Sequence, residues 1–379
     1  MTSGSIAMIL CAAAAAQSPE VIRVGPRGQV ATVAEAAKLA RDGSVIEIEA
    51  GDYRGDVAVW TQNDLTIRGV GGRPKLIASG FAAERKAIWV LRGGNVTVED
   101  IEFHRAKVPD KNGAGIRLER GTLTVRRCAF FDNENGILTR DDKALAVTIE
   151  DSEFARNGAG DGLSHGVYIG GISKLTVRGS YFHSGKVGHL IKSRAQENYV
   201  LYNRLTDDIG GTSSYEIEFP QGGLAVVIGN LIQQSALTEN PALISFGAEG
   251  YKWPRNELYV SHNTLVNDRT ENGFFVQVAP GPGTARVVNN VLVGVGTELT
   301  PPQVTASGNV RLEWDQFVLP PRLDYRLRLK SKVAGTASDP GSVGGIQLRP
   351  TYEITIPIGA SPVNPASPLS PGAFQKLVN

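Results

Sequence analysis

Three short stretches of the chain carry its most reactive side chains, and they recur at regular intervals. They are residues 164–170, 187–194 and 213–219. His189 follows His165 at the same interval at which Lys192 follows Tyr168 and Glu216 follows Lys192. If this shared interval is one turn of a repeating structure, the two histidines stack in one column and the other three side chains in a second.

Lys192 is the candidate general base. Alternate side chains of a strand face opposite sides, so Lys192 and Arg194 are expected to project outward together. A lysine with a lowered pKa could remove the proton next to a carboxylate, while Arg194 or Arg204 holds that carboxylate with paired hydrogen bonds. Tyr168 could protonate the leaving oxygen or form a platform for a sugar. The alternatives are an outward aromatic ladder at Tyr168 and a surface ion pair between Lys192 and Glu216, which contributes about 0–1 kcal/mol.

The two histidines have several possible roles. Stacked coils would bring His165 and His189 to about 4.8 Å from each other. Two histidines bind a metal only when further ligands join them, so the sequence predicts no metal site here. We expect one of them to neutralise charge near Lys192 or to carry a proton, and a purely structural pair is the alternative.

Glu216 and Glu218 are two residues apart in a predicted strand, so both side chains are expected on one face. Their Cα atoms would then lie roughly 6.5–7 Å apart. They could form ion pairs with Lys192 and Arg194, bind a cation, or serve as the acid and base of a glycoside hydrolase.

The longest repeat opens with a loop over residues 246–256 that is rich in aromatic and basic residues. Tyr251 and Trp253 could stack on sugar rings, and Arg255 could bind an acidic group. The alternative is a loop that only covers the core.

The elements that must position these residues are short strands. Apolar segments of strand period recur from Leu65 to Val288. From Val96 onward their spacing stays within the range of roughly 20–50 residues that repeat architectures show. Asparagine recurs in the turns that follow them, as at Asn203 and Asn230. A period at the short end of that range, without helices, predicts an all-β solenoid of parallel sheets, a parallel β-helix. A β-propeller would need roughly 40–50 residues and four strands per repeat.

The ends of the chain differ from the repeats. Thr32 and Glu35 form a capping-box pattern that predicts a short helix over residues 33–41, which would cap the first coil. Residues 1–16 are apolar and small and are predicted to be a signal peptide, which implies a periplasmic or secreted protein. Residues 17–310 are expected to form the β-helix, and the proline-rich residues 311–379 the last coils and a wrapping tail.

Composition excludes several classes of protein. The formal net charge is +1, so nothing favours a nucleic-acid partner. No apolar run reaches the roughly 18 residues of a membrane span. Without the leader the sole cysteine is Cys128, which cannot form an intramolecular disulfide and is expected in the core. We expect a monomer.

The helix and the Leu-Thr-Ile or Leu-Thr-Val coils, together with residues 324–329 (DYRLRL), resemble the pectate-lyase-like superfamily. That resemblance implies a right-handed parallel β-helix. Locally, Ile191-Lys192-Ser193, Asn198 and Tyr202-Asn203 are similar to the alginate lyase and chondroitinase B family. This similarity implies a lyase whose base is Lys192, with Tyr202 near the substrate and Ca²⁺ as a possible cofactor.

Two positions depart from that family. That family has a catalytic arginine one coil after its lysine, where this chain has residues 216–222 (EIEFPQG). The family also has a calcium-binding acid just before its lysine, and in that neighbourhood this chain has His189. We therefore predict a polysaccharide lyase that cleaves uronic-acid-containing chains by β-elimination. A hydrolase that uses Glu216 and Glu218, and a non-catalytic carbohydrate-binding or envelope protein, are the alternatives.

Overall fold

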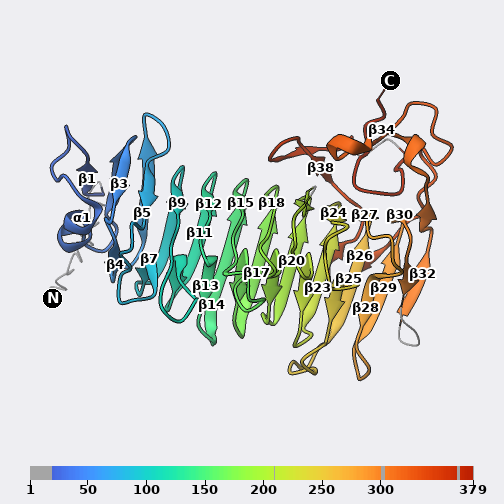
Figure 1. The fold of residues 1–379 in the computed structure, drawn as a ribbon, viewed down its shortest axis with the longest axis horizontal. Coiled ribbons are helices and arrows are strands. Elements are labelled where there is room, and N and C mark those ends of the chain that lie inside the picture. The colour runs from blue at the N-terminus through green and yellow to red at the C-terminus, as the bar shows by residue number, and fades with distance from the viewer. Residues whose placement is uncertain (1–18, 209, 300–303, 365–367, 379) are drawn as a thin grey trace, which may run out of the picture.

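A computed structural model describes residues 19–208, 210–299, 304–364 and 368–378. In these residues the chain winds into three long parallel sheets that share one axis, with one α-helix at the N-terminal end (Figure 1). The parallel β-helix expected from the repeats is confirmed. The predicted signal peptide lies outside the described residues. No helix among them combines the length and apolar character needed to cross a membrane.

Each coil contributes one strand to each sheet, so sheet neighbours are consecutive coils. Sheet 1 consists of β1 (Val21–Val24), β2 (Val45–Glu49), β5 (Leu65–Val70), β8 (Asn95–Glu99), β11 (Thr122–Arg126), β14 (Asp142–Glu150), β17 (Ile172–Arg178), β20 (Glu197–Leu201), β23 (Leu224–Ile228), β26 (Glu257–Ser261), β29 (Thr284–Val288) and β32 (Val304–Ser307). Sheet 2 consists of β3 (Asp52–Arg54), β6 (Lys75–Ile77), β9 (Glu102–His104), β12 (Ala129–Phe131), β15 (Glu153–Ala155), β18 (Tyr181–His183), β21 (Arg204–Thr206), β24 (Leu231–Gln234), β27 (Thr264–Asn267), β30 (Val291–Gly294) and β33 (Val310–Arg311). Sheet 3 consists of β4 (Ala58–Trp60), β7 (Ala87–Leu91), β10 (Ala114–Leu118), β13 (Asn135–Thr139), β16 (Val167–Ile169), β19 (Ile191–Ser193), β22 (Ile217–Phe219), β25 (Ala242–Phe246), β28 (Phe274–Val278) and β31 (Thr297–Leu299).

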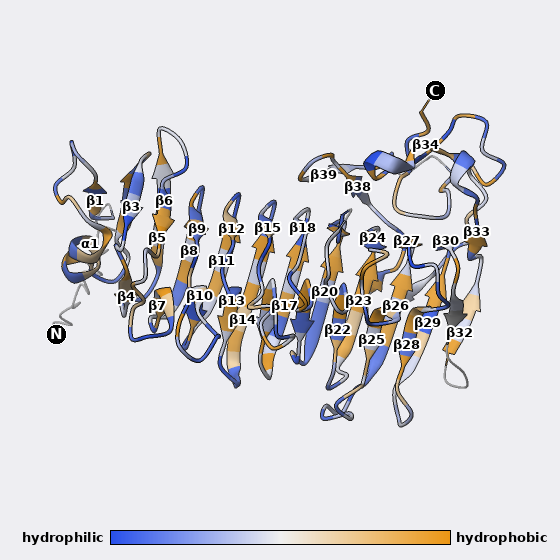
Figure 2. Cartoon of the chain, viewed as in Figure 1, coloured by the Kyte–Doolittle hydropathy of each residue, from blue (hydrophilic) through white to orange (hydrophobic). Residues whose placement is uncertain are grey.

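Alternating side chains of the strands fill the interior. In β11, for example, Leu123 and Val125 are buried, and the residues that alternate with them face outward. The strands are accordingly largely apolar and many of the turns polar (Figure 2). Inside sheet 2 the rings of Phe103, Phe130 and Phe154 stack coil upon coil, with centroids 5.0 and 4.6 Å apart. Cys128 also lies in this core, where burial raises the pKa of its thiol to about 12.

The predicted capping box is confirmed. Helix α1 (Val33–Leu39) begins after Thr32, whose hydroxyl accepts the backbone N–H of Glu35 at 3.2 Å, while the Glu35 carboxylate accepts the N–H of Thr32 at 3.1 Å. The helix ends two residues earlier than the pattern suggested. Its buried face, which includes Val33 and Ala36, packs onto the first coil and covers the end of the core.

The C-terminal part returns along the outside of the solenoid (Figure 1). Its short elements are η1 (Trp314–Gln316), β34 (Phe317–Leu319), η2 (Pro320–Arg322), β35 (Asp324–Leu327), β36 (Ser342–Val343), β37 (Ile346–Gln347), β38 (Tyr352–Ile354) and β39 (Ala360–Pro362). The backbone N–H of Gly359 donates to the carbonyl of Gly179 at 2.8 Å, far back along the chain. This tail covers the turns between sheets 1 and 2 with a second apolar cluster around Tyr325 and Leu348.

The turns between sheets 1 and 2 are joined by a ladder of buried asparagines. Asn203, Asn230, Asn263 and Asn290 occupy equivalent places in successive coils. The side-chain oxygen of Asn230 accepts the backbone N–H of Asn203 at 2.8 Å. Its amide nitrogen donates to the carbonyl of Val200 at 2.8 Å and to the side chain of Asn263 at 2.9 Å. The ladder therefore satisfies backbone groups that the tight turn would otherwise leave buried and unpaired.

We predict that Asn230→Ala destabilises the protein by about 2–4 kcal/mol, because it leaves the N–H of Asn203 and the carbonyl of Val200 without partners. Urea denaturation would measure the change. Asn272→Ala is the matched control, because this asparagine is exposed and its loss should change stability by no more than about 0.5 kcal/mol. Equal effects of the two substitutions would contradict the ladder's role.

Candidate functional site on sheet 3

The register of three neighbouring strands decides which side chains meet. Tyr168 in β16 lies opposite Lys192 in β19, as the shared interval predicted. The next step along the column is longer by two positions, because Ile191 pairs with Ile217 in β22. Lys192 therefore lies opposite Glu218, and the prediction that Glu216 continues the column is wrong.

Lys192 is held by two carboxylates. Its Nζ is 2.9 Å from Oε2 of Glu218 and 3.3 Å from Oε1 of Glu249. Arg194 forms a paired contact with Glu249, at 2.8 Å through Nε and 2.6 Å through Nη2. The side chain of Lys192 is only 13% exposed. Lys192 and Arg194 face the same side, as expected, and Glu249 bridges them, whereas Glu218 contacts Lys192 alone of the two.

The two histidines stack, which confirms their predicted column. The rings of His165 and His189 have centroids 4.5 Å apart. The N–H of His189 donates to Nδ1 of His165 at 3.0 Å, and the N–H of Tyr215 donates to Nδ1 of His189 at 3.2 Å. Each Nδ1 is thus an acceptor, which assigns the proton to Nε2. Nε2 of His189 then donates to Glu218 at 3.0 Å.

These contacts keep the imidazoles neutral and Glu218 ionised. Burial lowers the pKa of both His165 and His189, well below its ordinary value in the case of His165. Burial acts to raise the pKa of Glu218, but the hydrogen bond from His189 and the charge of Lys192 outweigh it and lower that pKa. The hydrogen bond from Arg194 is the main cause that lowers the pKa of Glu249, to about 2. Both acids are therefore anions at neutral pH.

A groove of about 510 Å³ opens beside this network, on the side where sheet 3 turns into sheet 1. Three arginines line it, Arg117, Arg140 and Arg194, together with Tyr168 and Asp141. The guanidinium of Arg194 lies 5.2 Å from the centre of the Tyr168 ring. Nε of Arg117 is buried and has no hydrogen-bond partner among the described residues. The groove therefore concentrates positive charge around a phenol.

One of the three predicted sugar-binding residues of the 246–256 loop reaches this site. The indole N–H of Trp253 donates to the carbonyl of Arg194 at 3.1 Å, and the ammonium of Lys143 lies over the indole at 5.2 Å from its centre. Tyr251 instead packs against Gly247 of its own loop and against glycines of the neighbouring loops, and its hydroxyl donates to the carbonyl of Ala279 at 2.7 Å. Arg255 pairs with Glu257 on sheet 1.

Arg204 and Tyr202 lie far from this groove, so the structure contradicts their predicted place beside Lys192. Arg204 belongs to sheet 2, stacks over Tyr181 at 4.2 Å and donates to the tail carbonyl of Pro357. Tyr202 lies in a turn between sheets 1 and 2, where its hydroxyl accepts the N–H of Thr351 at 3.1 Å. Both residues anchor the C-terminal tail.

Glu216 is also not on the outer face. It precedes β22 at a corner of the solenoid, is fully buried, and neither carboxylate oxygen has a hydrogen-bond partner among the described residues. The equivalent residues of the neighbouring coils, Leu190 and Leu243, belong to the apolar core. Burial, and then the charge of Asp207, raise the pKa of Glu216 well above its ordinary value. The two-residue spacing failed because the strand begins only at Ile217, so Glu216 does not follow its alternation.

The calcium ion implied by the family resemblance finds no fitting ligands near Lys192. His189 occupies the relevant neighbourhood, and both of its nitrogens already have partners. Across the described residues, no group of three or more histidines, cysteines or carboxylates is placed to hold a metal.

The sequence interpretation missed Glu249, Arg117, Arg140 and Asp141. Arg117 belongs to the column, since it pairs with Leu138 and Leu138 with Tyr168. The first of these steps is shorter than the interval between Tyr168 and Lys192, and the second is longer, so a search at one fixed interval could not find Arg117. Glu249 lies in the loop between β25 and β26, far along the chain from its partner Arg194, and the period of the repeats does not predict where such a loop folds.

Comparisons with known proteins concern the fold. Residues 75–205 match the family described as right handed beta helix region, which agrees with the expected handedness. No curated protein matches the chain. Among solved structures, ORF18 of Geobacillus virus E2 is similar at 14% identity and a TM-score of 0.40. The match covers 71% of this chain and 53% of the viral one, so it spans about half of that protein. The pectate lyase Pel9A is similar at 14% identity and a TM-score of 0.47, over 95% of this chain and 97% of that one.

We predict that Glu216→Leu stabilises the protein by about 1–3 kcal/mol at pH 8, because it removes a buried carboxyl group without partners. The folded state keeps a proton on Glu216 that the unfolded chain releases above a pKa near 4.5. Wild-type stability therefore falls as the pH rises through this range, and the advantage of leucine grows with pH. Denaturation at pH 4 and pH 8 would measure it.

The matched control is Glu239→Leu, at an exposed glutamate, which should change stability by no more than about 0.5 kcal/mol at either pH. A less stable Glu216→Leu protein at pH 8 would show that polar partners hold this carboxyl group.

Proposed function

We propose that this protein is a carbohydrate-active enzyme that cleaves a uronic-acid-containing polysaccharide by β-elimination, in the groove beside Tyr168 and Lys192. The observation that carries the proposal is the convergence of Arg117, Arg140 and Arg194 on Tyr168 in one open groove. Arginine pairs with carboxylates through two parallel hydrogen bonds, and a uronic acid presents a carboxylate on every sugar. Trp253, whose indole N–H donates to the carbonyl of the lining residue Arg194, adds an aromatic surface for a sugar ring.

β-Elimination makes three demands on such a site. The uronate carboxylate must be neutralised, the proton on the neighbouring carbon must be removed, and the leaving oxygen must receive a proton. Arg194, whose guanidinium lies over the Tyr168 ring, is placed for the first task, and Arg117 for the carboxylate of a neighbouring sugar. Tyr168 can serve the other two in its phenolate form, which takes the proton from the carbon and delivers that same proton to the leaving oxygen as the C–O bond breaks. The guanidinium of Arg194, 5.2 Å from the centre of the Tyr168 ring, stabilises negative charge on the phenol oxygen during this transfer.

Lys192 then acts as a fixed cation rather than as the base expected from the family resemblance. A base must be free of its proton, whereas both contacts of Lys192 are ion pairs that suit an ammonium group. It lies beside Tyr168 in the column and does not line the groove. We assign it the role of stabilising the enolate-like charge and positioning Glu249, which in turn orients Arg194.

The geometry gives less support to a hydrolase that uses Glu216 and Glu218. An inverting or retaining hydrolase needs two carboxyl groups on either side of the bond to be cleaved. Glu216 lies inside the core, and Glu218 is buried and occupied by His189 and Lys192. A protein that binds acidic polysaccharide without turnover would use the same arginines, and the following experiment distinguishes it.

We predict that Tyr168→Phe lowers kcat on acidic polysaccharides by about 10²–10⁴-fold, because it removes the proton-transfer group. Lys192→Ala should lower it by about 10²–10³-fold, since a fixed charge is lost. Lys192→Arg should stay within about tenfold of the wild type. The ultraviolet absorbance of the unsaturated product measures elimination, and reducing ends measured in parallel would reveal hydrolysis.

Arginine cannot act as a base in proteins, so Lys192→Arg is the decisive variant. If it is as inactive as Lys192→Ala while both proteins remain folded, Lys192 is the base and the role of Tyr168 is wrong. Binding of uronate polymers with neither product at any pH would replace the enzyme proposal with a binding function.

We further predict that Arg117→Gln raises KM by about tenfold with a smaller change in kcat, because it removes a contact to substrate carboxylate some distance from the reacting proton. Arg140→Gln, on the same groove, serves for comparison. A fall in kcat alone would place Arg117 at the reacting carboxylate.

A further inference from the structure

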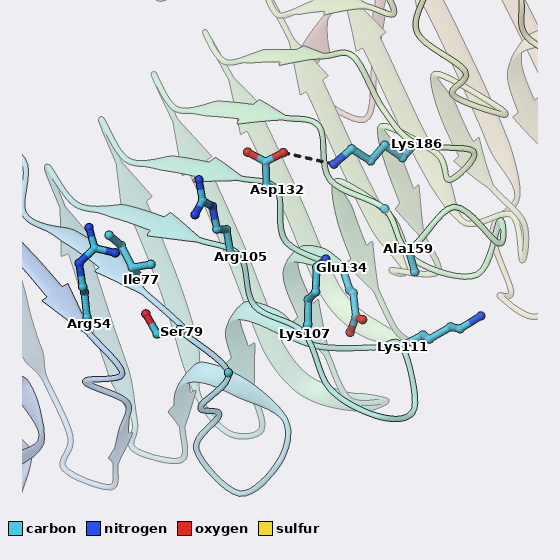
Figure 3. Close-up of a pocket in the computed structure, with 12 residues that line it drawn as sticks. Arg54, Ile77, Ser79, Arg105, Lys107, Lys111, Asp132, Glu134, Ala159 and Lys186 are labelled. Carbon is cyan, nitrogen blue, oxygen red and sulfur yellow. Dashed lines mark hydrogen bonds and ion pairs between the residues drawn. The ribbon is translucent and has the colours of Figure 1, made fainter.

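A second groove, of about 690 Å³, lies on the opposite border of sheet 3, where the loops from sheet 2 enter it (Figure 3). It crosses successive coils from β3 to the loop after β18 and shares no lining residue with the groove beside Tyr168. The loop between β9 and β10 separates the two, since Lys111 lines this groove and Asn112 the other. Its course follows the long axis of the solenoid over about five coil spacings, or roughly 24 Å.

The lining is predominantly basic. Arg54, Arg105, Lys107, Lys111 and Lys186 contribute positive charge, against two acids, Asp132 and Glu134. Both acids already have partners within the protein. The groove as a whole therefore carries an excess of positive charge, and its cations are distributed along its length.

Asp132 is the centre of a local ion-pair cluster. Its carboxylate receives Arg156 at 2.9 Å and Lys186 at 3.2 Å. Figure 3 shows the contact with Lys186 across the groove. Because two cations share this one acid, the cluster remains positive.

Glu134 has a structural role. Its Oε2 accepts the backbone N–H groups of Val108 at 3.0 Å and of Gly113 at 2.7 Å, which fixes the loop that carries Lys107 and Lys111. Lys111 itself makes only a long contact with Asp161, at 3.6 Å, and is mostly exposed.

Arg105 and Lys107 are the unused cations of the groove. Both side chains are exposed, and within the described ranges neither has a carboxylate within ion-pair distance. In Figure 3 Arg105 lies between Arg54 and Asp132, and Lys107 lies beside Glu134. They are the side chains that an anionic ligand can pair with at no cost to existing ion pairs.

An aromatic side chain marks one end of the groove. Phe81 is 61% exposed, follows the lining residues Ser79 and Gly80, and lies against Gly55, the neighbour of Arg54. A Cβ at Gly55 would come within 2.8 Å of the Phe81 ring, so the backbone glycine is what allows this close contact. An exposed ring beside a line of cations provides a surface for the apolar face of a sugar.

We infer that this basic groove is a binding site for an extended acidic polysaccharide, separate from the groove beside Tyr168. Carboxylate or sulfate groups along the chain pair with Arg105, Lys107 and Lys186, and one sugar stacks on Phe81. Asp132 and Glu134 can accept hydrogen bonds from sugar hydroxyls, which a glycan offers along its length. The formal net charge of +1 gives the protein no general attraction for nucleic acid. The inference concerns binding alone and does not rest on the proposed function.

The first test compares two pairs of substitutions that remove the same charge. Arg105→Gln with Lys107→Gln removes the unused cations of the groove. Lys330→Gln with Lys332→Gln removes two exposed lysines in the C-terminal part and is the matched control. Binding of fluorescent oligogalacturonate is measured by anisotropy at low ionic strength. We expect the first pair to weaken binding about tenfold, with a weaker salt dependence, and the control to change it less than twofold.

The second test locates the bound chain. Oligogalacturonate whose carboxylates have been activated with carbodiimide should couple to the amines of Lys107, Lys111 and Lys186, and peptide mass spectrometry identifies the coupled lysines. Addition of unlabelled polygalacturonate should suppress this coupling but not background coupling at Lys330.

Equal weakening by both pairs of substitutions, or coupling confined to Lys143 and Lys192, would overturn the inference. Tighter binding of single-stranded DNA than of the uronate chain at this groove would also overturn it. Loss of turnover in the Tyr168→Phe protein with groove binding intact would separate the two proposals.

Discussion

The register between consecutive coils is the constraint on which the rest of this structure depends. Each strand hydrogen-bonds to the coil before and the coil after it, at a spacing of about 4.8 Å, so a residue's neighbours along the solenoid are fixed once a single pair is fixed. A slip of one residue would move every apolar side chain to the outer face. Ile191 pairs with Ile217 because both must lie in the core, where neither is exposed. That pairing alone places Lys192 opposite Glu218, and so determines which charged side chains of the site meet.

The site contains charged groups that are already paired within the protein and others that face the groove, where a ligand can reach them. Glu218 forms an ion pair with Lys192, and Glu249 forms an ion pair with Arg194. The neutral histidines behind these acids complete the network through the contact of His189 with Glu218. Such a network fixes positions, because each ion is held by at least one partner in partly buried surroundings. Arg117 and the groove face of Tyr168 lie beyond it. The rigid network and the open groove together make an arrangement that can receive a carboxylate.

The solenoid and its loops have different tasks. The stacked interior of phenylalanines and the asparagine ladder hold a straight, stiff scaffold. The residues that complete the site, such as Glu249 and Trp253, come from the loop between β25 and β26. This agrees with the general tendency of binding residues to lie on loops that a rigid scaffold positions. The basic groove likewise follows the loops between sheets 2 and 3 rather than the strands.

The sequence by itself determined the fold, the helix cap and part of the site. Strand alternation and the recurring turns predicted the parallel β-helix, and Thr32 and Glu35 predicted the cap. One shared interval predicted that His165 stacks on His189 and that Tyr168 lies opposite Lys192. These features are local or cross a single loop of regular length.

Only the tertiary structure decided that Glu218 rather than Glu216 meets Lys192, that Glu249 bridges the cations, and that Arg204 holds the tail. The physical reason is that loop length varies from coil to coil. Counting residues along the sequence therefore predicts the wrong strand pairs after the first loop of different length. In the folded chain, hydrogen bonding between strands and burial of apolar side chains fix the correct pairs.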